Sequence, residues 1–401
     1  MEPHHIALLG AGGFAIGAHL PAIAATDTLH LVAVWSRSLS SVNSLVEASK
    51  KHASTAHDLS VYSEDPSTEN LDALLARSDI QTVAVALPIP SQPAIIERAW
   101  RAGKNVISEK PVAPSLEEAK KLVDLYEREY KPRGLLWIVA EQMAHMQSFE
   151  KARQIIADGK IGELRSFQVE VYIQPSVAAG KTTWRTVPDY QGGYVLDGGV
   201  HFAAGLRHMI PHPITSLYAH YSQIQPHLPP CDTLTALVTA TPSTSPNPAH
   251  SAAPTSLTGT FHLTFGTEAP SSTRLYTFRG SKGVLTLDFG QARIHTLKLV
   301  NFPSSLSAPP SASDPLGTER NEEPHELTIE LPAMGVEDEF EAFGKALVAG
   351  AGSEEAKDVE RRSGPRATMR DLGFIEGGLL SSKKGKAIDL VQLVGEEYFR
   401  I

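Results

Sequence analysis

The chain has 401 residues, with 36 lysine and arginine residues against 45 aspartate and glutamate residues, and one cysteine. This length predicts two or three domains at about 150 residues each, and the 42% of hydrophobic residues excludes disorder as a description of the whole chain. The net charge of −9 argues against nucleic acid or an anionic membrane as the main partner, since phosphate binding needs clustered basic side chains.

The cysteine content and the termini bear on the cellular compartment. The lone Cys231 cannot form an intrachain disulfide and excludes a cysteine-based zinc site. The N-terminus does not have the basic and apolar segments of a secretory signal, and no window approaches the ~18 apolar residues of a membrane span. We therefore expect a soluble, cytoplasmic protein.

Short apolar runs alternate with amphipathic stretches over the first 140 residues. The predicted strands are residues 6–9, 31–35, 61–62, 82–87, 106–107 and 135–139. A helix is predicted from Ser115 to Tyr126, where Ser115 and Glu118 form a capping box. This alternation predicts a Rossmann domain at residues 1–142, built on a doubly wound parallel sheet.

The pattern changes after about residue 160. Successive strands with little helix between them are predicted at residues 164–173, 217–224, 234–240, 257–265, 274–278, 284–289, 294–300 and 327–331. Helices are predicted at 338–349 and 366–381, and the Pro- and Ser-rich stretches 241–256 and 303–325 as surface loops. We expect an α+β domain over residues 143–401, with a large, mostly antiparallel, open-faced sheet.

A glycine-rich loop follows the first predicted strand and opens a helix. It comprises Gly10, Gly12, Gly13, Phe14 and Ala15, in the pattern G-x-G-x-x-A. The first glycine permits a tight turn, the second lets the backbone approach a pyrophosphate, and a small last residue allows close packing of helix and strand. The helix N-terminus then favours the phosphates. We predict a dinucleotide site here; a glycine-rich turn without a ligand is the alternative.

The end of the second predicted strand bears on the choice of cofactor. An NAD site usually carries an acidic residue there for the ribose 2′-hydroxyl. This strand instead ends in Ser36 and Arg37, and Asp27 precedes it. A hydroxyl and a guanidinium suit a 2′-phosphate, so we predict that NADP(H) is preferred over NAD(H). The alternative is that Arg37 is a solvated loop residue.

Several motifs in order along the chain resemble the glucose-fructose oxidoreductase / inositol dehydrogenase / MocA (Gfo/Idh/MocA) family of oxidoreductases. Besides the glycine loop, they are Leu87–Pro90, Glu109-Lys110-Pro111, Gly159–Leu164, Trp184-Arg185 and Gly192–His201, together with the helical segments 339–349 and 369–381. The resemblance covers most of the chain. The E-K-P tripeptide directly follows the fifth predicted strand, at the sheet edge where doubly wound folds bind ligands.

The resemblance implies roles for individual residues. Lys110, Asp197 and His201 match the family's catalytic lysine and its D-x-x-x-H pair. The implied cofactor contacts are Leu87, Pro88, Pro90, Gln92, Glu109 and Lys110, and the implied substrate contacts are Trp184, Arg185, His145, Asp197 and His201. Gln92 stands where many relatives have histidine, and Ala144-His145 where they often have Arg-Phe, so a relative's substrate cannot be transferred.

The proposed catalytic residues suit proton transfer. Residues i and i+4 share one helix face, so Asp197 and His201 can face one pocket, although Asp197 could instead be a helix cap. A histidine accepts and returns protons near neutral pH. We expect burial and a neighbouring cation to lower the pKa of Lys110 so that it could share this work. Which of Lys110 and His201 is the principal acid/base stays open.

The sequence thus predicts an NADP(H)-dependent oxidoreductase that interconverts an alcohol and a carbonyl on a sugar, polyol or other small substrate, with no metal. The resemblance implies a homodimer or homotetramer that pairs through the open sheet face. Two alternatives remain: a dinucleotide-sensing regulatory protein of the same fold without catalysis, and an enzyme of the glucose-fructose type that keeps its cofactor bound.

Overall fold

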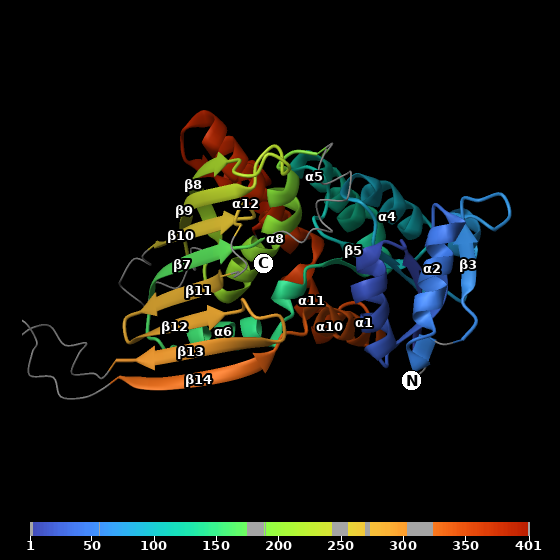
Figure 1. The fold of residues 1–401 in the computed structure, drawn as a ribbon, viewed down its shortest axis with the longest axis horizontal. Helices are drawn as coiled ribbons and strands as arrows, with labels where there is room; N and C mark the ends of the chain where they lie inside the picture. Colours follow the sequence, from blue (N-terminus) through green and yellow to red (C-terminus); the bar gives the residue numbers. More distant parts are fainter. Residues whose placement is uncertain are drawn as a thin grey trace, which may run out of the picture.

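The first sheet of the molecule is the predicted Rossmann sheet (Figure 1). The computed structural model describes residues 3–55, 57–174, 188, 190–242, 256–268, 273–302 and 324–399. Six strands pair in parallel in the order β3-β2-β1-β4-β5-β6. They are β1 (His4–Leu9), β2 (Leu29–Ser36), β3 (Ser60–Ser63), β4 (Thr82–Val85), β5 (Asn105–Glu109) and β6 (Trp137–Ala140). The order reverses between β1 and β4, and this reversal marks the ligand crevice of doubly wound folds.

Helices cover both faces of this sheet. On one face lie α3 (Leu71–Ala76), α4 (Gln92–Arg101) and α5 (Leu116–Leu125). The other is covered by α1 (Leu20–Ala25) and α2 (Leu39–Ser49), and by α10 (Gly335–Ala349) and α11 (Glu354–Ser363) from much later in the chain. The division at residue 142 remains a prediction, but the chain returns to the first sheet after completing most of the second.

The glycine loop connects β1 to a short π-helical turn, η1 (Ala15–His19), which leads into α1. Gly10 has a φ of +121°, and a Cβ on it would lie 2.2 Å from the carbonyl oxygen of Ala86. An L side chain therefore fits neither the backbone conformation nor the space at this position. Gly10 brings the end of β1 directly against the end of β4.

The second sheet has nine strands in the order β14-β13-β12-β11-β7-β10-β9-β8-β15. Their bounds are β7 (Leu164–Tyr172), β8 (Ile214–Ser222), β9 (Thr233–Ala240), β10 (Leu257–Thr264), β11 (Thr273–Gly280), β12 (Gly283–Asp288), β13 (Ile294–Asn301), β14 (His325–Pro332) and β15 (Ile388–Asp389). All pairs are antiparallel except β7 with β10. The predicted mostly antiparallel sheet and its eight longer strands are confirmed.

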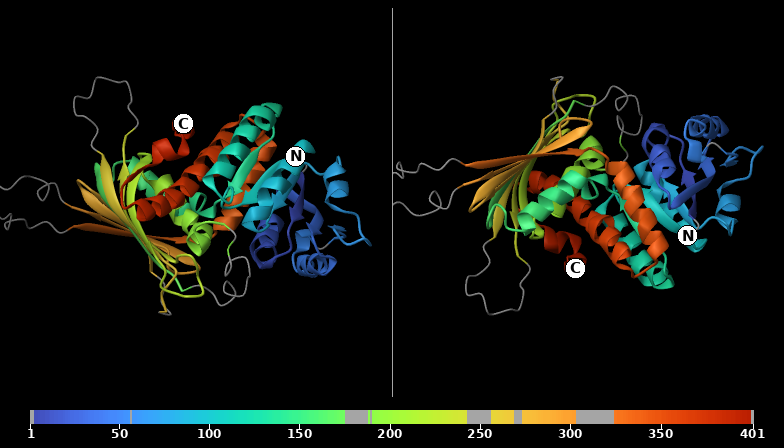
Figure 2. Two further views of the ribbon diagram at one scale, coloured as in Figure 1. Left: turned by 90° about the horizontal axis from the view of Figure 1, so that it is seen from above. Right: turned by 90° about the horizontal axis from the view of Figure 1, so that it is seen from below.

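Helices α6 (Gln147–Ala157), α8 (Gly193–Met209) and α12 (Pro365–Lys384) pack on one face of the second sheet (Figure 2). No helix of the described residues covers the opposite face, where Tyr172, Tyr218 and Leu237 are exposed. The remaining short helical elements are α13 (Leu390–Val394), η2 (Ala53–Thr55), η3 (Ile89–Ser91), η4 (Tyr126–Tyr130), η5 (Lys131–Arg133), η6 (Gln142–Ala144) and η8 (Glu396–Tyr398).

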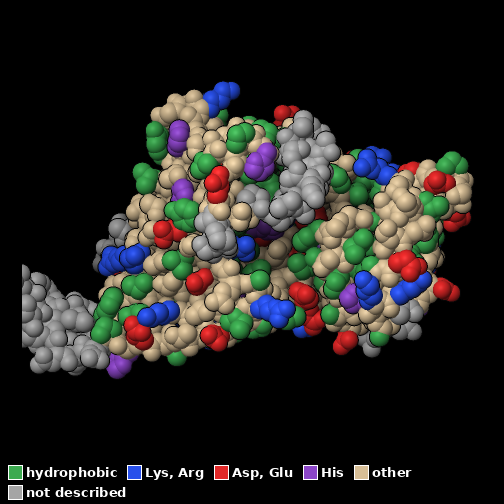
Figure 3. Space-filling view, viewed as in Figure 1, with side chains coloured by type: hydrophobic (Ala, Val, Ile, Leu, Met, Phe, Trp, Pro, Cys, Tyr) green, Lys and Arg blue, Asp and Glu red, His purple; other side chains and the backbone are tan. Residues whose placement is uncertain are grey.

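The surface carries charges of both signs. On the face shown in Figure 3, acidic and basic side chains are interspersed rather than gathered into one basic area. Within the described part of the chain, none of the helices combines the length and the apolar character that a membrane crossing requires.

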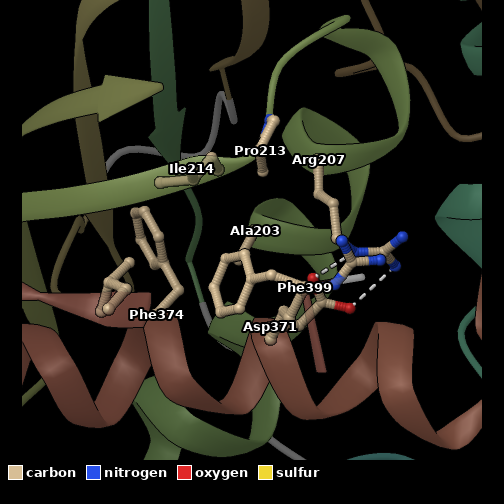
Figure 4. Close-up of a pocket in the computed structure, with 9 residues that line it drawn as sticks. Ala203, Arg207, Pro213, Ile214, Asp371, Phe374 and Phe399 are labelled. Carbon is tan, nitrogen blue, oxygen red and sulfur yellow. Dashed lines mark hydrogen bonds and ion pairs between the residues drawn. The ribbon is translucent and has the colours of Figure 1, made fainter. Parts of the chain in front are cut away.

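Helix α8 is fixed firmly against its surroundings. It begins at Gly193, where φ is +50° and a Cβ would lie 2.3 Å from the carbonyl oxygen of Pro229. Near its other end, the Arg207 guanidinium donates to both carboxylate oxygens of Asp371 on α12, at 2.7 and 2.9 Å (Figure 4). Such a bidentate pair fixes orientation as well as distance. The residues that α8 carries between these two anchors are therefore held in defined positions.

Candidate functional site

A cleft of about 500 Å³ lies between the carboxyl edge of the first sheet and helix α8. Its lining comprises Gly10, Ala11, Gly12, Gly13, Phe14, Ala15, Ser36, Arg37, Ser41, Ala86, Leu87, Pro88, Ile89, Glu109, Lys110, Tyr194, Asp197, Gly198 and His201. The sequence segments that were predicted to bind the cofactor and to catalyse the reaction thus meet in one cavity.

The glycine loop leaves room for a ligand along its backbone. A Cβ built on Gly12 or Gly13 would meet no atom within 4 Å, so these positions face open space rather than a packed neighbour. Beside them Phe14 is exposed and makes an edge contact with the ring of His19. A backbone that can be approached this closely fits the pyrophosphate of a dinucleotide.

Ser36, Arg37 and Ser41 line the part of the cleft beside the end of β2. Ser38 caps the N-terminus of α2 by accepting a hydrogen bond from the backbone N–H of Ser41. The acidic residues of the lining are Glu109 and Asp197, which lie on β5 and α8 instead. Two hydroxyls, a guanidinium and a helix N-terminus together fit a phosphate group at the end of β2.

Lys110 forms an ion pair with Asp197 across the cleft. Its Nζ donates to Oδ1 of Asp197 at 2.9 Å and to the backbone oxygen of the same residue at 2.8 Å. Burial alone would lower the pKa of Lys110, but the nearby carboxylates of Asp197 and Glu109 raise it. The expected lowering of this pKa is therefore wrong, because the neighbours of the lysine are anions. Lys110 keeps its proton and has a third N–H left to donate.

His201 pairs with a residue that the sequence did not single out as functional. Its Nδ1 lies 2.7 Å from Oε1 of Glu141, which is 1% exposed and follows strand β6. Asp197 lies inside α8, whose N-cap is Gly192, so the alternative of Asp197 as a helix cap is excluded. The two residues of the D-x-x-x-H pair thus hold different partners.

Glu109, the first residue of the E-K-P tripeptide, accepts a hydrogen bond from Nε2 of the buried His19 at 2.6 Å. Burial would raise the pKa of Glu109, but His19 and the charge of Lys110 lower it. His19 was not predicted as a site residue. Its ring fixes the Glu109 carboxylate, which lines the cleft next to Lys110.

A further buried carboxyl group lies close to these pairs. Glu339 on α10 is 1% exposed, and neither of its oxygens has a hydrogen-bond partner within the described residues. Burial, reinforced by the charges of Glu109 and Glu141, raises its pKa well above the usual value of 4.5. Both effects favour the neutral form of Glu339 over the carboxylate.

The structure does not bring every predicted site residue into the cleft. Leu87 and Pro88 line it, whereas Pro90 and the buried Gln92 do not. His145 is also buried outside the cleft, where its Nε2 is 2.8 Å from the Ser363 hydroxyl, and burial lowers its pKa well below the usual value. We therefore leave these three residues out of the site.

Two further predictions concern Trp184, Arg185 and a metal. Trp184 and Arg185 lie outside the described residues. In the ranges that the structure describes, no group of three or more His, Cys, Asp or Glu side chains is arranged to hold a metal ion. Ser41 and Tyr194, which were not predicted, also line the cleft.

Two family profiles match the chain. Residues 4–132 match the oxidoreductase family with an NAD-binding Rossmann fold, and residues 149–286 match the GFO/IDH/MocA C-terminal domain. The dehydrogenase FPY6 of Fusarium mangiferae is 32% identical over 397 residues, which cover 96% of this chain and 99% of that protein. The 3-reductase of dTDP-3,4-didehydro-2,6-dideoxy-alpha-D-glucose from Streptomyces violaceoruber is 31% identical over 49% of this chain and 51% of that protein.

Solved structures share the fold at lower identity. The 3-ketoreductase KijD10 of Actinomadura kijaniata, in complex with NADP and TDP-benzene, has a TM-score of 0.68 at 21% identity, over 95% of this chain and 98% of that one. Levoglucosan dehydrogenase with NADH and levoglucosan has a TM-score of 0.73 at 17% identity, over 97% and 99%. The predicted resemblance is confirmed: the chain belongs to the GFO/IDH/MocA family of NAD(P)-binding oxidoreductases, which act on CH–OH and C=O groups.

Proposed function

We propose that the protein is an NADP(H)-dependent oxidoreductase that interconverts a carbonyl and an alcohol on a carbohydrate or polyol-like substrate. The observation that carries the proposal is a single cleft lined by the glycine loop, Arg37, Lys110 and His201. These residues come from three strand ends of the first sheet and from helix α8. One end of the cleft fits a dinucleotide, and the other carries residues that can polarise an oxygen and move a proton.

The preference for NADP(H) is supported by charge. At the end of β2 the lining offers Arg37, Ser36 and Ser41 but no carboxylate. A 2′-phosphate there would receive charge-assisted hydrogen bonds and the favourable dipole of α2. A 2′-hydroxyl would find no carboxylate acceptor and would leave the guanidinium without an anion.

Three side chains divide the work at the reacting carbon. NADP(H), when bound, supplies or accepts the hydride. Lys110 stays protonated, and its third N–H donates to the substrate oxygen and draws electron density from the carbonyl. Nε2 of His201 gives a proton to that oxygen in reduction and takes it back in oxidation. Asp197 holds Lys110 in place.

The substrate class is supported by relatives. The similar reductase of Streptomyces violaceoruber is named for a dTDP-sugar substrate, and a neighbour of the same fold binds levoglucosan. Tyr194 places an aromatic ring on the α8 side of the cleft. With NADPH as the cellular cofactor, reduction is the direction that we propose.

We also propose a homodimer or homotetramer formed through the open face of the second sheet. Tyr172, Tyr218 and Leu237 expose apolar surface there, with Leu237 at 62%. Burial of such a surface favours association. For the location we propose the cytoplasm, a reducing compartment that suits the single, buried Cys231.

Fluorescence titration with NADPH and NADH side by side tests the cofactor assignment. We expect tight binding of NADPH, and Arg37→Ala should weaken it by about 10- to 100-fold, the strength of a charge-assisted pair, with little effect on NADH. Arg98→Ala is the matched control, because Arg98 pairs with Asp72 outside the cleft. Equal losses for both cofactors would refute the role of Arg37, and binding of neither would refute the proposed function.

Once NADPH binding is established, turnover of candidate substrates is measured. Aldehydes, ketoses and sugar lactones are screened by the loss of NADPH absorbance. Cofactor that survives gel filtration with the protein would assign it to the class that keeps NADP(H) bound and shuttles hydride between two substrates. Full dependence on added NADPH would assign it to the enzymes that release and rebind their cofactor in each turnover.

A further inference from the structure

The carboxylate of Glu141 is unusually well fixed. Its Oε1 accepts the backbone N–H of Met143 at 3.3 Å and lies 2.7 Å from Nδ1 of His201. Glu141 thereby caps the turn η6 that follows β6. Since Glu141 is almost fully buried, solvent does not compete for these contacts. Its position is set by the backbone of the first domain, whereas His201 stands on α8.

This contact decides which nitrogen of the His201 ring is free. A carboxylate only accepts hydrogen bonds, so Nδ1 must carry the hydrogen. Nε2 is then the nitrogen that remains for a ligand, and His201 lines the cleft. A carboxylate behind an imidazole also stabilises the ring when it takes up a second proton. Glu141 thus supplies both the tautomer and the countercharge that a proton-transferring histidine needs.

Asp197 binds Lys110, and the contact to Nδ1 of His201 comes from Glu141 instead. Its Oδ1 and its backbone oxygen both accept from Lys110. We infer that Glu141 is the positioning residue of His201: it holds the ring in the Nδ1–H tautomer and so makes Nε2 the atom that exchanges the proton of the substrate hydroxyl. The inference deepens the proposed function and rests on it for the identity of that proton.

Other charged groups lie around the Glu141–His201 pair, and their arrangement is consistent with Glu141 serving His201 while Asp197 serves Lys110. Lys110 and Glu109 face it from the end of β5, and Asp197 from α8 itself. Tyr276 of β11 and Asp371 of α12 lie within reach of the charge of Glu141. From α10 comes Glu339, and its raised pKa favours the neutral form, which avoids a second negative charge beside Glu141.

Helix α8 offers an internal control. Two turns after His201 it carries His208, whose Nε2 lies 3.0 Å from Oε2 of Glu150. In this second carboxylate–histidine pair His208 is buried and Glu150 is partly exposed, and neither residue lines the cleft. Loss of Glu150 therefore removes a carboxylate–histidine contact from the same helix, together with an ion pair to Arg153, without touching the site.

The tautomer of His201 can be read directly. The ¹⁵N shifts of histidine-labelled protein distinguish Nδ1–H from Nε2–H, and a His201→Gln spectrum assigns the resonances. We expect Nδ1–H in the wild type, loss of that signature in Glu141→Leu, which has no acceptor for Nδ1–H, and its retention in Glu141→Asp and Glu150→Leu. With the first carbonyl compound that the wild type reduces, kcat should fall about 10²- to 10⁴-fold in Glu141→Leu with KM little changed.

NADPH titration separates folding from function. Glu141→Leu should bind NADPH as the wild type does. If it does not fold, Glu141→Gln replaces it, because its amide keeps the size of the side chain but not the countercharge, so that kcat should still fall. An Nε2–H tautomer in the wild type, or an unchanged His201 spectrum in Glu141→Leu, would overturn the inference. A wild type that binds no NADPH would overturn the proposed function instead, and the spectra would still decide the role of Glu141.

Discussion

The buried Glu339 should make the stability of the protein fall as the pH rises, and Glu339→Gln should remove this dependence. The native state keeps this carboxyl protonated, whereas the unfolded chain releases the proton above a pKa near 4.5. Above that pH the native state therefore binds one more proton than the unfolded state. The free energy of unfolding then falls by about 1.4 kcal/mol per pH unit, until the native carboxyl itself ionises. Between pH 6 and pH 8 this amounts to about 2.7 kcal/mol when the native carboxyl stays protonated over the whole range.

Thermal unfolding of both proteins across this range measures the effect. At about 2.1 cal/mol/K per residue, the 401 residues give an unfolding entropy of about 0.8 kcal/mol/K. The Tm of Glu339→Gln, relative to that of the wild type, should therefore rise by about 3 °C from pH 6 to pH 8. A glutamine amide is close in size and charge to the neutral acid, so the two proteins should differ least at the lower pH.

A matched variant tests whether the loss of any acidic group from α10 changes the pH dependence of the Tm. Glu341 lies on the same helix, with an exposed side chain paired to Lys345. Glu341→Gln also removes one acidic group from α10, but its Tm difference from the wild type should stay constant over this range. If the difference for Glu339→Gln were equally constant, the native state would hold Glu339 ionised, and the reasoning from its burial would be refuted.

Three further outcomes follow from the structure. Lys110→Met should reduce kcat/KM about 10²- to 10³-fold, because a fixed donor to the reacting oxygen is lost. Gly10→Ala should lower the Tm by several degrees, since its Cβ would clash with the β4 end, while Gly12→Ala should keep the Tm and lose NADPH binding in fluorescence titration. Leu237→Asp should shift the protein to the monomer in sedimentation, because it puts a charge on the open sheet face.

The variants of Lys110 and Leu237 each have a matched control. Lys121→Met removes an exposed lysine that pairs with Glu117, and it should leave kcat/KM unchanged. Lys384→Asp alters the end of α12, on the covered side of the second sheet, and should leave the oligomer intact. An unaltered oligomer in Leu237→Asp would contradict pairing through the open face, and full NADPH binding by Gly12→Ala would contradict the approach of the pyrophosphate to the loop.

Local periodicity was sufficient to predict most of the fold. The parallel strands of the first sheet are buried on both faces, and the strands of the second alternate, so both leave a clear pattern. Helix α11 was missed because only Ala356, Val359 and Ser363 are buried on an otherwise charged segment. Strand β15 has two residues, Ile388–Asp389, too few for any period.

Residues of the site could be predicted only where their spacing along the sequence places them on the same element. The i, i+4 spacing placed Asp197 and His201 on one helix, as expected. The partners of these residues depend on tertiary structure: Lys110 meets Asp197 across 87 positions of sequence, and Glu141 meets His201 across 60. Glu141 and His145 are four residues apart, yet only Glu141 reaches the site, because the η6 turn between them sends His145 towards Ser363.

The return of α10 to the first sheet has a consequence for synthesis of the protein on the ribosome. Phe340 and Phe343 belong to the same buried cluster as Ile6 and Leu8 of β1. The nascent N-terminal part therefore emerges long before the helix that covers this side of its sheet. Until then apolar surface stays open, and such surface promotes aggregation. The cofactor-binding half thus completes its folding only when nearly the whole chain has been translated, and a fragment that ends after β6 should be a poor folding unit.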